Sequence, residues 1–570
     1  MDTSRAHPQG ESPALISCET QVALSDAIKV KAPRLPPELI QRVALFLPDS
    51  ITFFAFLDAY ANDDDGVLGD LVSFRVLRDV TLPQHLWPQL RVNAATQTRA
   101  LVHVEKVAKY FPMIEISDSV DVTALRLAPS TLVQLRVTPR SRCWPPFLNQ
   151  RWSTFSSASF ILPPNAKPSL IHLKDLQLDG NAQTPTTTWD VLFRYLESSN
   201  ITSLSINASM QVSSVHLWHV VRWLQHCPVE NVQIERWNFD DARDVLPAFY
   251  TALASCATLK ALRLSEITLP NIAHTPFPTP LSAHKVQIID CHLSQDDKHA
   301  LFCGFERVTE LHWTVWGTKL YNLPQYVPRL EHLELKHMMH DNMENLCESL
   351  CSAMIHTLVL TDFTATKTTI KSSMQCMRWI ITYLPQWRHL KNIKLRQFCI
   401  GAAQMNSLGV ALSQARTLRC LELNFKNSMD LSILAPYLGK MLLHELVIRD
   451  CRVNEFPGWT STNSNPFEDI FASNSLYSIS FRMCGLKSTD ILQLKDAVVA
   501  NSSIRDISLM SNRVSAADIS ALLNAMKNRV TSVLKLHVVL GNTPQEDITA
   551  LREHAKNITR QIYSVFVDSL

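Results

Sequence analysis

The chain has 570 residues, of which 46% are hydrophobic and 19% are charged, and its formal net charge is +2. A chain of this length exceeds what one compact core reaches, so it forms either several domains or one elongated repeat array. The near-neutral charge gives no sign of a chain-wide affinity, so we expect no nucleic acid and no membrane among its partners.

The cysteines indicate a reducing environment. All 13 are irregularly spaced and none stands in a CxxC pair, which favours reduced core thiols over a disulfide framework. The first 20 residues contain no apolar run of signal-peptide length, and no apolar stretch of about 18 residues predicts a membrane span. We therefore expect a cytoplasmic and/or nuclear protein.

The polar, mixed composition of residues 1–33 predicts a disordered tail. A small all-α module is expected next, over residues 34–75. Pro36 and Pro37 stand where a helix can begin, and Pro48 ends that helix. Asp49 or Ser50 can cap a second helix. The first helix carries apolar residues at helical spacing, namely Leu39, Ile40, Val43 and Leu47.

This module resembles the F-box motif, which opens with LPxE, continues with a helical run of aliphatic residues and LP, and ends in further apolar helices. The matching residues are Leu35, Pro36, Pro37, Glu38, Leu39, Ile40, Val43, Phe46, Leu47, Pro48 and Phe53–Leu57. The sequence departs from the motif in the third helix, where residues 61–66 interrupt. Trp87 can supply the tryptophan contact that the motif usually has there. The alternative is a two-helix N-terminal cap for the segments that follow.

In the F-box family, this module docks onto the Skp-type adaptor of a cullin–RING ubiquitin ligase. The resemblance implies that the exposed parts of one set of residues insert into the adaptor: Leu35, Pro36, Leu39, Ile40, Val43, Leu47 and Pro48. Their i, i+3, i+4 spacing suits a helix that lies in a groove. Residues 76–121 are expected to be a linker and an N-terminal cap.

A six-residue pattern, apolar–x–x–apolar–x–apolar, recurs through residues 122–544. The clear copies are Leu173–Leu178, Ile201–Ile206, Val229–Ile234, Leu259–Leu264, Val308–Trp313, Leu330–Leu335, Ile355–Leu360, Leu390–Leu395, Leu418–Leu423, Leu443–Ile448, Leu476–Phe481 and Ile504–Leu509. Weaker copies are Val122–Leu127, Leu132–Val137, Ala283–Ile288 and Val533–Val538. From Leu173 onward the spacing of the copies centres near 28 residues, which is within the leucine-rich-repeat range.

Each copy predicts a short strand, because its last two apolar residues are two apart and share a face. The intervening segments read as amphipathic helices, for example Ser214–Cys227 and Ala516–Asn528. Strand followed by helix at this period resembles the ribonuclease-inhibitor-like leucine-rich repeats. The resemblance implies an α/β solenoid, a horseshoe with a parallel concave sheet and a helical convex side. The usual asparagine or cysteine after the strand is often missing. Residues 545–570 are expected to be a C-terminal capping helix.

Polar strand positions of such a repeat face the concave side, where a partner protein binds. Their charge is mixed, with one basic concentration: Arg388, Lys391, Lys394 and Arg396, then Arg416 and Arg419 one repeat later. This cluster can receive an acidic partner segment. The alternative is a set of ordinary solvated strand edges beside Glu422.

No catalytic motif is present: the sequence has no GxxxxGK[ST] loop, GxSxG elbow, HExxH site or kinase signature. We therefore expect no enzyme activity and no cofactor. The densest histidine group is His332, His337 and His340, but His332 falls within a strand and the others beyond it. Ligands on one face are needed for a metal, so we expect surface histidines and no metal site.

The leading hypothesis is thus a substrate-recruiting, F-box-type adaptor of a Skp–cullin–RING ubiquitin ligase. It would hold an unidentified target protein through its repeats. The alternative is a leucine-rich-repeat scaffold or inhibitor with no ligase role.

Overall fold

The computed structural model describes residues 35–60, 66–117, 132–136, 155–159, 175–179, 186–270, 272–274, 277, 279–314, 323–337, 343–362, 368–426, 430–450, 465–526, 535–540, 545–558 and 564–569. The chain divides into two compact units, Met1–Arg151 and Trp152–Leu570. The expected disordered tail and the weak repeat copy at residues 122–127 lie outside the described residues.

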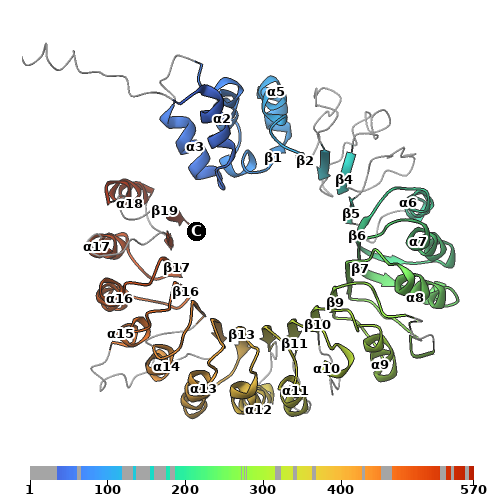
Figure 1. The fold of residues 1–570 in the computed structure, drawn as a ribbon. Coiled ribbons are helices and arrows are strands. Elements are labelled where there is room, and N and C mark those ends of the chain that lie inside the picture. The colour runs from blue at the N-terminus through green and yellow to red at the C-terminus, as the bar shows by residue number, and fades with distance from the viewer. Residues whose placement is uncertain are drawn as a thin grey trace, which may run out of the picture. The chain divides into compact units, whose positions relative to one another are not determined.

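The first unit begins with helices and continues into parallel strands (Figure 1). Its elements are α2 (Pro37–Leu45), α3 (Ser50–Ala59), η1 (Gly69–Leu71), α4 (Val72–Arg78), η2 (Pro83–His85), β1 (Leu90–Val92), α5 (Ala94–Ala108), β2 (Met113–Ser117) and β3 (Leu132–Arg136). The two expected helices are present, and Asp49 caps the second by accepting a 2.8 Å hydrogen bond from the Thr52 amide. The module boundary expected at residue 75 falls inside α4. The segment expected to be a linker contains β1, α5 and β2, and β2 pairs in parallel with β1 and β3.

An aromatic cluster forms the core of the helical module. Trp87 stacks on Phe53 with ring centroids 4.4 Å apart, and Phe74 packs edge-on against Phe53 at 4.9 Å. The Trp87 indole donates a 2.7 Å hydrogen bond to the Leu47 carbonyl at the end of the first helix. Trp87 thus joins the two expected helices to the segment that follows them.

The second unit repeats one strand and, in most repeats, one helix. Its strands are β4 (Phe155–Ser159), β5 (Asp175–Asp179), β6 (Ser203–Gln211), β7 (Asn231–Asn238), β8 (Ala261–Ser265), β9 (Lys285–Ile289), β10 (Glu310–Thr314), β11 (His332–Lys336), β12 (Thr357–Thr361), β13 (Asn392–Phe398), β14 (Cys420–Phe425), β15 (Glu445–Arg449), β16 (Ser478–Arg482), β17 (Asp506–Asn512), β18 (Lys535–Leu540) and β19 (Ser564–Ser569). Each strand pairs in parallel with the next one along the chain.

The strands line the inner, concave side of this unit and the helices cover the outer side (Figure 1). The helices are α6 (Thr186–Glu197), α7 (Ser214–His226), α8 (Leu246–Ser255), α9 (Gln295–Cys303), α10 (Leu323–Tyr326), α11 (Met343–Leu350), α12 (Thr368–Tyr383), α13 (Ala402–Gln414), α14 (Leu431–Leu438), α15 (Pro466–Phe471), α16 (Ser488–Ala500), α17 (Ala516–Met526) and α18 (Gln545–Ile558). In β13, Ile393 and Leu395 are fully buried, while Lys394 between them is half-exposed. This alternation confirms the leucine-rich-repeat α/β solenoid predicted from the apolar ladder.

A left-handed residue marks the turn after many strands. Among the described residues, it stands two positions after the last apolar residue of the LxxLxL copy in eight repeats: Arg236, Glu266, Asp290, His337, Gln397, Asp450, Met483 and Ser511. Where the structure describes the residue that follows, its side chain is buried in the stack, as for Trp237, Ile267 and Phe398. Asn512 and Cys484 occupy that position and bond to main-chain groups of neighbouring repeats. The same turn therefore recurs although its sequence varies.

The C-terminus differs from the expected single helix. Helix α18 ends at Ile558, and β19 follows it, pairing in parallel with β18 over six residues. The end of the segment expected to be helical, residues 564–569, is therefore a strand. Among the described residues, no helix is long and apolar enough to cross a membrane.

Candidate functional site on the concave sheet and the N-terminal helices

The concave face of the second unit consists of the strand side chains that point away from the helices. We define it as the first, third and fifth positions of each five-residue strand core, for example Asn392, Lys394 and Arg396 in β13. These positions stand in columns because neighbouring strands pair in register. Val359 and Val447 are buried members of the central column, so the face is not uniformly polar.

The basic cluster that the sequence predicted is organised around one buried carboxylate. Arg396 holds Glu422 with two hydrogen bonds of 2.9 and 3.1 Å. Arg449, on the opposite neighbouring strand, reaches the same carboxylate at 3.1 Å, and the Lys394 ammonium lies 3.7 Å away. We call Lys394, Arg396, Arg449 and Glu422 the Glu422 cluster. Within this cluster, three basic side chains thus surround one carboxylate.

The pKa of Glu422 lies below its usual range. Burial favours the neutral acid and raises the pKa, but the hydrogen bond and charge of Arg396, with the charges of Arg449 and Lys394, outweigh burial. Glu422 is therefore ionised at neutral pH and fixes the directions of the surrounding cations.

The other predicted basic residues lie outside this cluster. Arg388 and Lys391 are exposed in the turn before β13, and the Arg419 guanidinium donates to the carbonyls of Arg416 and Leu418. Sequence reasoning missed Arg449. The sequence could have indicated it, because Arg449 directly follows an LxxLxL copy. Arg396 has the same position two strands earlier.

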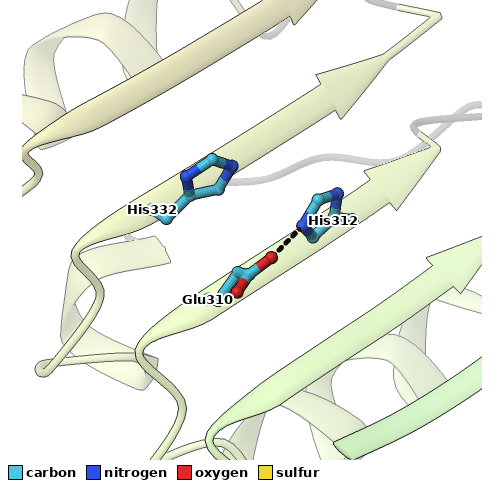
Figure 2. A group of neighbouring side chains, drawn as sticks. All are labelled: Glu310, His312 and His332. Carbon is cyan, nitrogen blue, oxygen red and sulfur yellow. Dashed lines mark hydrogen bonds and ion pairs between the residues drawn. The ribbon is translucent and has the colours of Figure 1, made fainter. Parts of the chain in front are cut away.

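A second polar group lies on β10 and β11. We call Glu310, His312, His332 and Glu334 the histidine cluster. Its central imidazole, His312, contacts a Glu310 oxygen through Nε2 at 2.6 Å (Figure 2) and a Glu334 oxygen through Nδ1 at 2.8 Å. The rings of His312 and His332 stack with their centroids 5.3 Å apart.

The two histidines have opposite pKa shifts. Burial lowers the pKa of His312, but its hydrogen bonds to Glu334 and Glu310 outweigh burial and raise it. Burial together with the neighbouring His312 lowers the pKa of His332. The hydrogen bond from His312 lowers the pKa of Glu334 to about 2. Lysines flank the cluster: Lys285 lies 2.6 Å from Glu310 and Lys336 lies 3.4 Å from Glu334.

The histidine group considered from sequence is not the one that the fold assembles. His337 occupies the left-handed turn after β11, beyond the strand, and His340 lies outside the described residues. His332 instead faces His312, 20 positions earlier in the chain. The sequence could have indicated this pair, because aligning the repeats of β10 and β11 in register places the two histidines on neighbouring strands.

The predicted adaptor-binding residues separate into exposed and buried groups. Leu35, Leu39 and Val43 are large apolar residues with about half of their surface exposed, and Phe46 is 85% exposed. We call these four the N-terminal apolar surface. Phe46, quoted above only as part of the motif match, is its most exposed member.

Ile40 is 3% exposed and belongs to the core of the helical module, so its place among the surface residues was wrong. An i, i+3, i+4 pattern does not say which face a helix buries, and here the α2 face with Ile40 and Ala44 is the buried one. Leu47 is partly buried beside the Trp87 contact, and Pro36 and Pro48 are exposed.

Comparison with known proteins adds little to this geometry. No protein-family model matches the chain, and no curated protein matches it. Solved structures that match include "Crystal structure of TLR13-ssRNA13 complex", at 14% sequence identity and a TM-score of 0.41. The match covers 82% of this chain and 69% of that one. The leucine-rich-repeat architecture of the second unit rests on its own strand register and recurring turns.

Proposed function

We propose that the protein is a substrate-recruiting, F-box-type subunit of a Skp–cullin–RING ubiquitin ligase. The observation that carries the proposal is the N-terminal apolar surface, which stands on a small helical module ahead of a leucine-rich-repeat solenoid. The proposed role needs no catalytic residue of its own, and its setting is the cytoplasm and/or nucleus. One end binds the adaptor and the concave face binds the target protein.

The N-terminal apolar surface has the chemistry of a helix-docking site. Leu39 and Val43 are one turn apart on α2, and both are 45% exposed. Leu35 and Phe46 flank them at the two ends of the helix. Apolar anchors at this spacing suit a hydrophobic groove in a partner. A solvent-exposed phenylalanine has the large apolar area that contributes most to such interfaces.

Co-purification with a Skp-type adaptor tests this assignment. We expect the full chain to bind the adaptor, and Leu39→Asp with Val43→Asp to abolish binding, because two charges would be buried in an apolar interface. The matched control is Val102→Asp on α5, an apolar residue of the same unit that is 62% exposed. Absent binding, or binding that survives the double substitution, contradicts the ligase role.

The target-binding half of the proposal concerns the Glu422 cluster. Its cations are held in place by a buried carboxylate, so little side-chain entropy is lost when a ligand binds. Basic side chains gathered on a concave sheet suit an acidic segment of a partner protein. We therefore assign β13 to β15 as the contact region for an acidic stretch of the target.

A fluorescent polyglutamate peptide serves as a probe for this region. Lys391→Glu with Lys394→Glu should weaken its binding at least tenfold, because two attractive charges become repulsive. The control is Lys535→Glu on β18, an exposed lysine on the same sheet. Equal affinity of the double variant and the wild type would remove the acidic contact at β13 from the proposal, and the adaptor-binding half would stand or fall on its own test.

The alternative function is a leucine-rich-repeat scaffold or inhibitor without a ligase role. The concave face supports the scaffold and the ligase subunit equally well, because in both functions it would bind a protein and carry no catalysis. Adaptor binding discriminates between the two: a chain that binds its target but no Skp-type adaptor is a scaffold.

A further inference from the structure

The histidine cluster forms a square of two imidazoles and two carboxylates on the concave face. In the register of β10 and β11, Glu310 pairs directly with His332, and His312 pairs directly with Glu334. Glu310 and His312 are two residues apart on one strand, so their side chains emerge on the same face. Neither proposed binding surface uses these four residues.

Three members of the square are close enough to share one ion. One ligand atom from each of Glu310, His312 and His332 lies within 4.8 Å of the other two (Figure 2). In a tetrahedral zinc site, with bonds of about 2.0–2.1 Å, the ligand atoms stand roughly 3.3–3.5 Å apart. Small side-chain rotations therefore bring the three groups onto one ion, and the paired strands need not move.

The two contacts of His312 require a cation. A neutral imidazole whose Nδ1 donates to Glu334 presents the lone pair of Nε2 to the Glu310 carboxylate, 2.6 Å away. Two acceptors at that distance repel each other unless a proton or a metal ion lies between them. A carboxylate that fixes the second nitrogen is the usual support of a metal-binding histidine, and Glu334 stands in that place.

His332 supplies an independent observation. Its Nε2 atom is buried and has no hydrogen-bond partner. A neutral imidazole with a bare ring nitrogen can offer the lone pair of that nitrogen to an ion. A buried polar atom without a partner destabilises the folded chain, and a bond to a metal ion would satisfy it.

We propose that Glu310, His312 and His332 bind one divalent transition-metal ion, with Zn²⁺ as the preferred species and water as the fourth ligand. Two imidazoles and one carboxylate favour Zn²⁺ over Mg²⁺ or Ca²⁺, which prefer sites made of oxygens. The metal takes the place of the proton on Nε2 of His312. Lys285, which is 44% exposed, turns from Glu310 into solvent.

Isothermal titration of the metal-stripped full chain with Zn²⁺ tests the site. We compare the wild type with His332→Ala and with Glu310→Gln, which keeps the side-chain size. The matched control is His537→Ala on β18, a half-exposed histidine of the same column whose cross-strand neighbours are Ser508 and Phe566. Repeating the titration with Co²⁺ adds a visible absorption band that reports the ligands.

His332→Ala and Glu310→Gln are each expected to weaken Zn²⁺ binding at least tenfold and to remove the Co²⁺ band, while His537→Ala leaves both unchanged. Glu334→Gln should weaken binding by about 10–100-fold, because Glu334 acts through His312. Zinc held by cysteines elsewhere is common to all these proteins and cancels in the comparison. Wild-type affinity in both ligand variants, or an equal loss in His537→Ala, overturns the proposal.

Discussion

Glu422 illustrates how one side chain can organise a surface. The carboxylate is 5% exposed and lies among cations from the strands on both sides. Burying an ion is costly unless several partners compensate it, and removing one partner of a buried pair is more costly than the pair is stabilising. The arrangement therefore constrains the directions of Arg396 and Arg449.

Glu422→Gln is expected to lower the free energy of unfolding by about 2–3 kcal/mol at pH 7, because three cations lose their shared partner. The pKa of Glu422 is depressed in the folded chain. Its stabilising effect is therefore complete above the unfolded value of about 4.3 and is lost as the pH falls through the folded value. Chemical denaturation of the wild type and the variant at pH 7 and pH 3 measures the difference. Glu445→Gln, at an exposed site on β15, should change stability by less than about 0.5 kcal/mol.

At the scale of single elements, a left-handed turn recurs after the strands. The same position takes a left-handed conformation in eight repeats, yet none of these residues is glycine. A side chain in this conformation costs roughly 1–2 kcal/mol, which the recurring backbone pairing offsets. The turn is thus imposed by the stack and not by local preference, which explains why no glycine marks it in the sequence.

Met483 allows a test of this strain, because its φ is 55° and its side chain is 60% exposed. Met483→Gly should raise the free energy of unfolding by about 1 kcal/mol, and Met483→Val should lower it by a similar amount. Met354→Gly is the control, at a site that is 51% exposed and has no positive φ. If glycine is as destabilising at Met483 as at Met354, the turn is not strained.

The helical module of the first unit depends on an aromatic residue that lies 40 positions after Leu47 in the chain but packs against the module's helices. Trp87 is buried between Phe53 and Phe111, and its indole nitrogen bonds to the chain at Leu47. Trp87→Ala should destabilise the module by about 3–5 kcal/mol through the cavity that it leaves. Hydrogen exchange of α2 and α3 measures this loss. Trp218→Ala, at a tryptophan that is 43% exposed, should leave that exchange unchanged.

At the scale of the whole molecule, each repeat of a solenoid depends on its neighbours. Helix α18 buries Ile548 and Leu551 and leads into β19, which covers one edge of β18. Because each repeat contacts mainly its neighbours, damage to α18 exposes the apolar ridge of the preceding repeat.

Leu551→Asp is therefore expected to lower the melting temperature and to cause aggregation, because a charge replaces a residue that is 2% exposed. Ala550→Asp, at the exposed neighbouring position, is the matched control. Thermal unfolding and size-exclusion chromatography of the full chain compare the two. Equal behaviour of the two variants would show that α18 does not protect the repeat that precedes it.

The sequence by itself determined the repeat architecture. Each LxxLxL copy encodes a strand whose apolar ridge only a neighbouring copy can bury, so a ladder of copies implies the stack, its direction and its buried columns. The helical start of the first unit was equally local, because prolines and capping residues set its limits.

Only the tertiary structure decided which polar residues meet. Neighbours on the sheet are separated by a whole repeat in the chain, and the length of the repeats varies, so the columns follow from strand register alone. That register brings His332 to Glu310 and places Arg396 and Arg449 around Glu422. Packing also decides that Ile40 is buried and Phe46 is exposed. Helical spacing shows which residues share a face, but it does not show which face packs against the rest of the module.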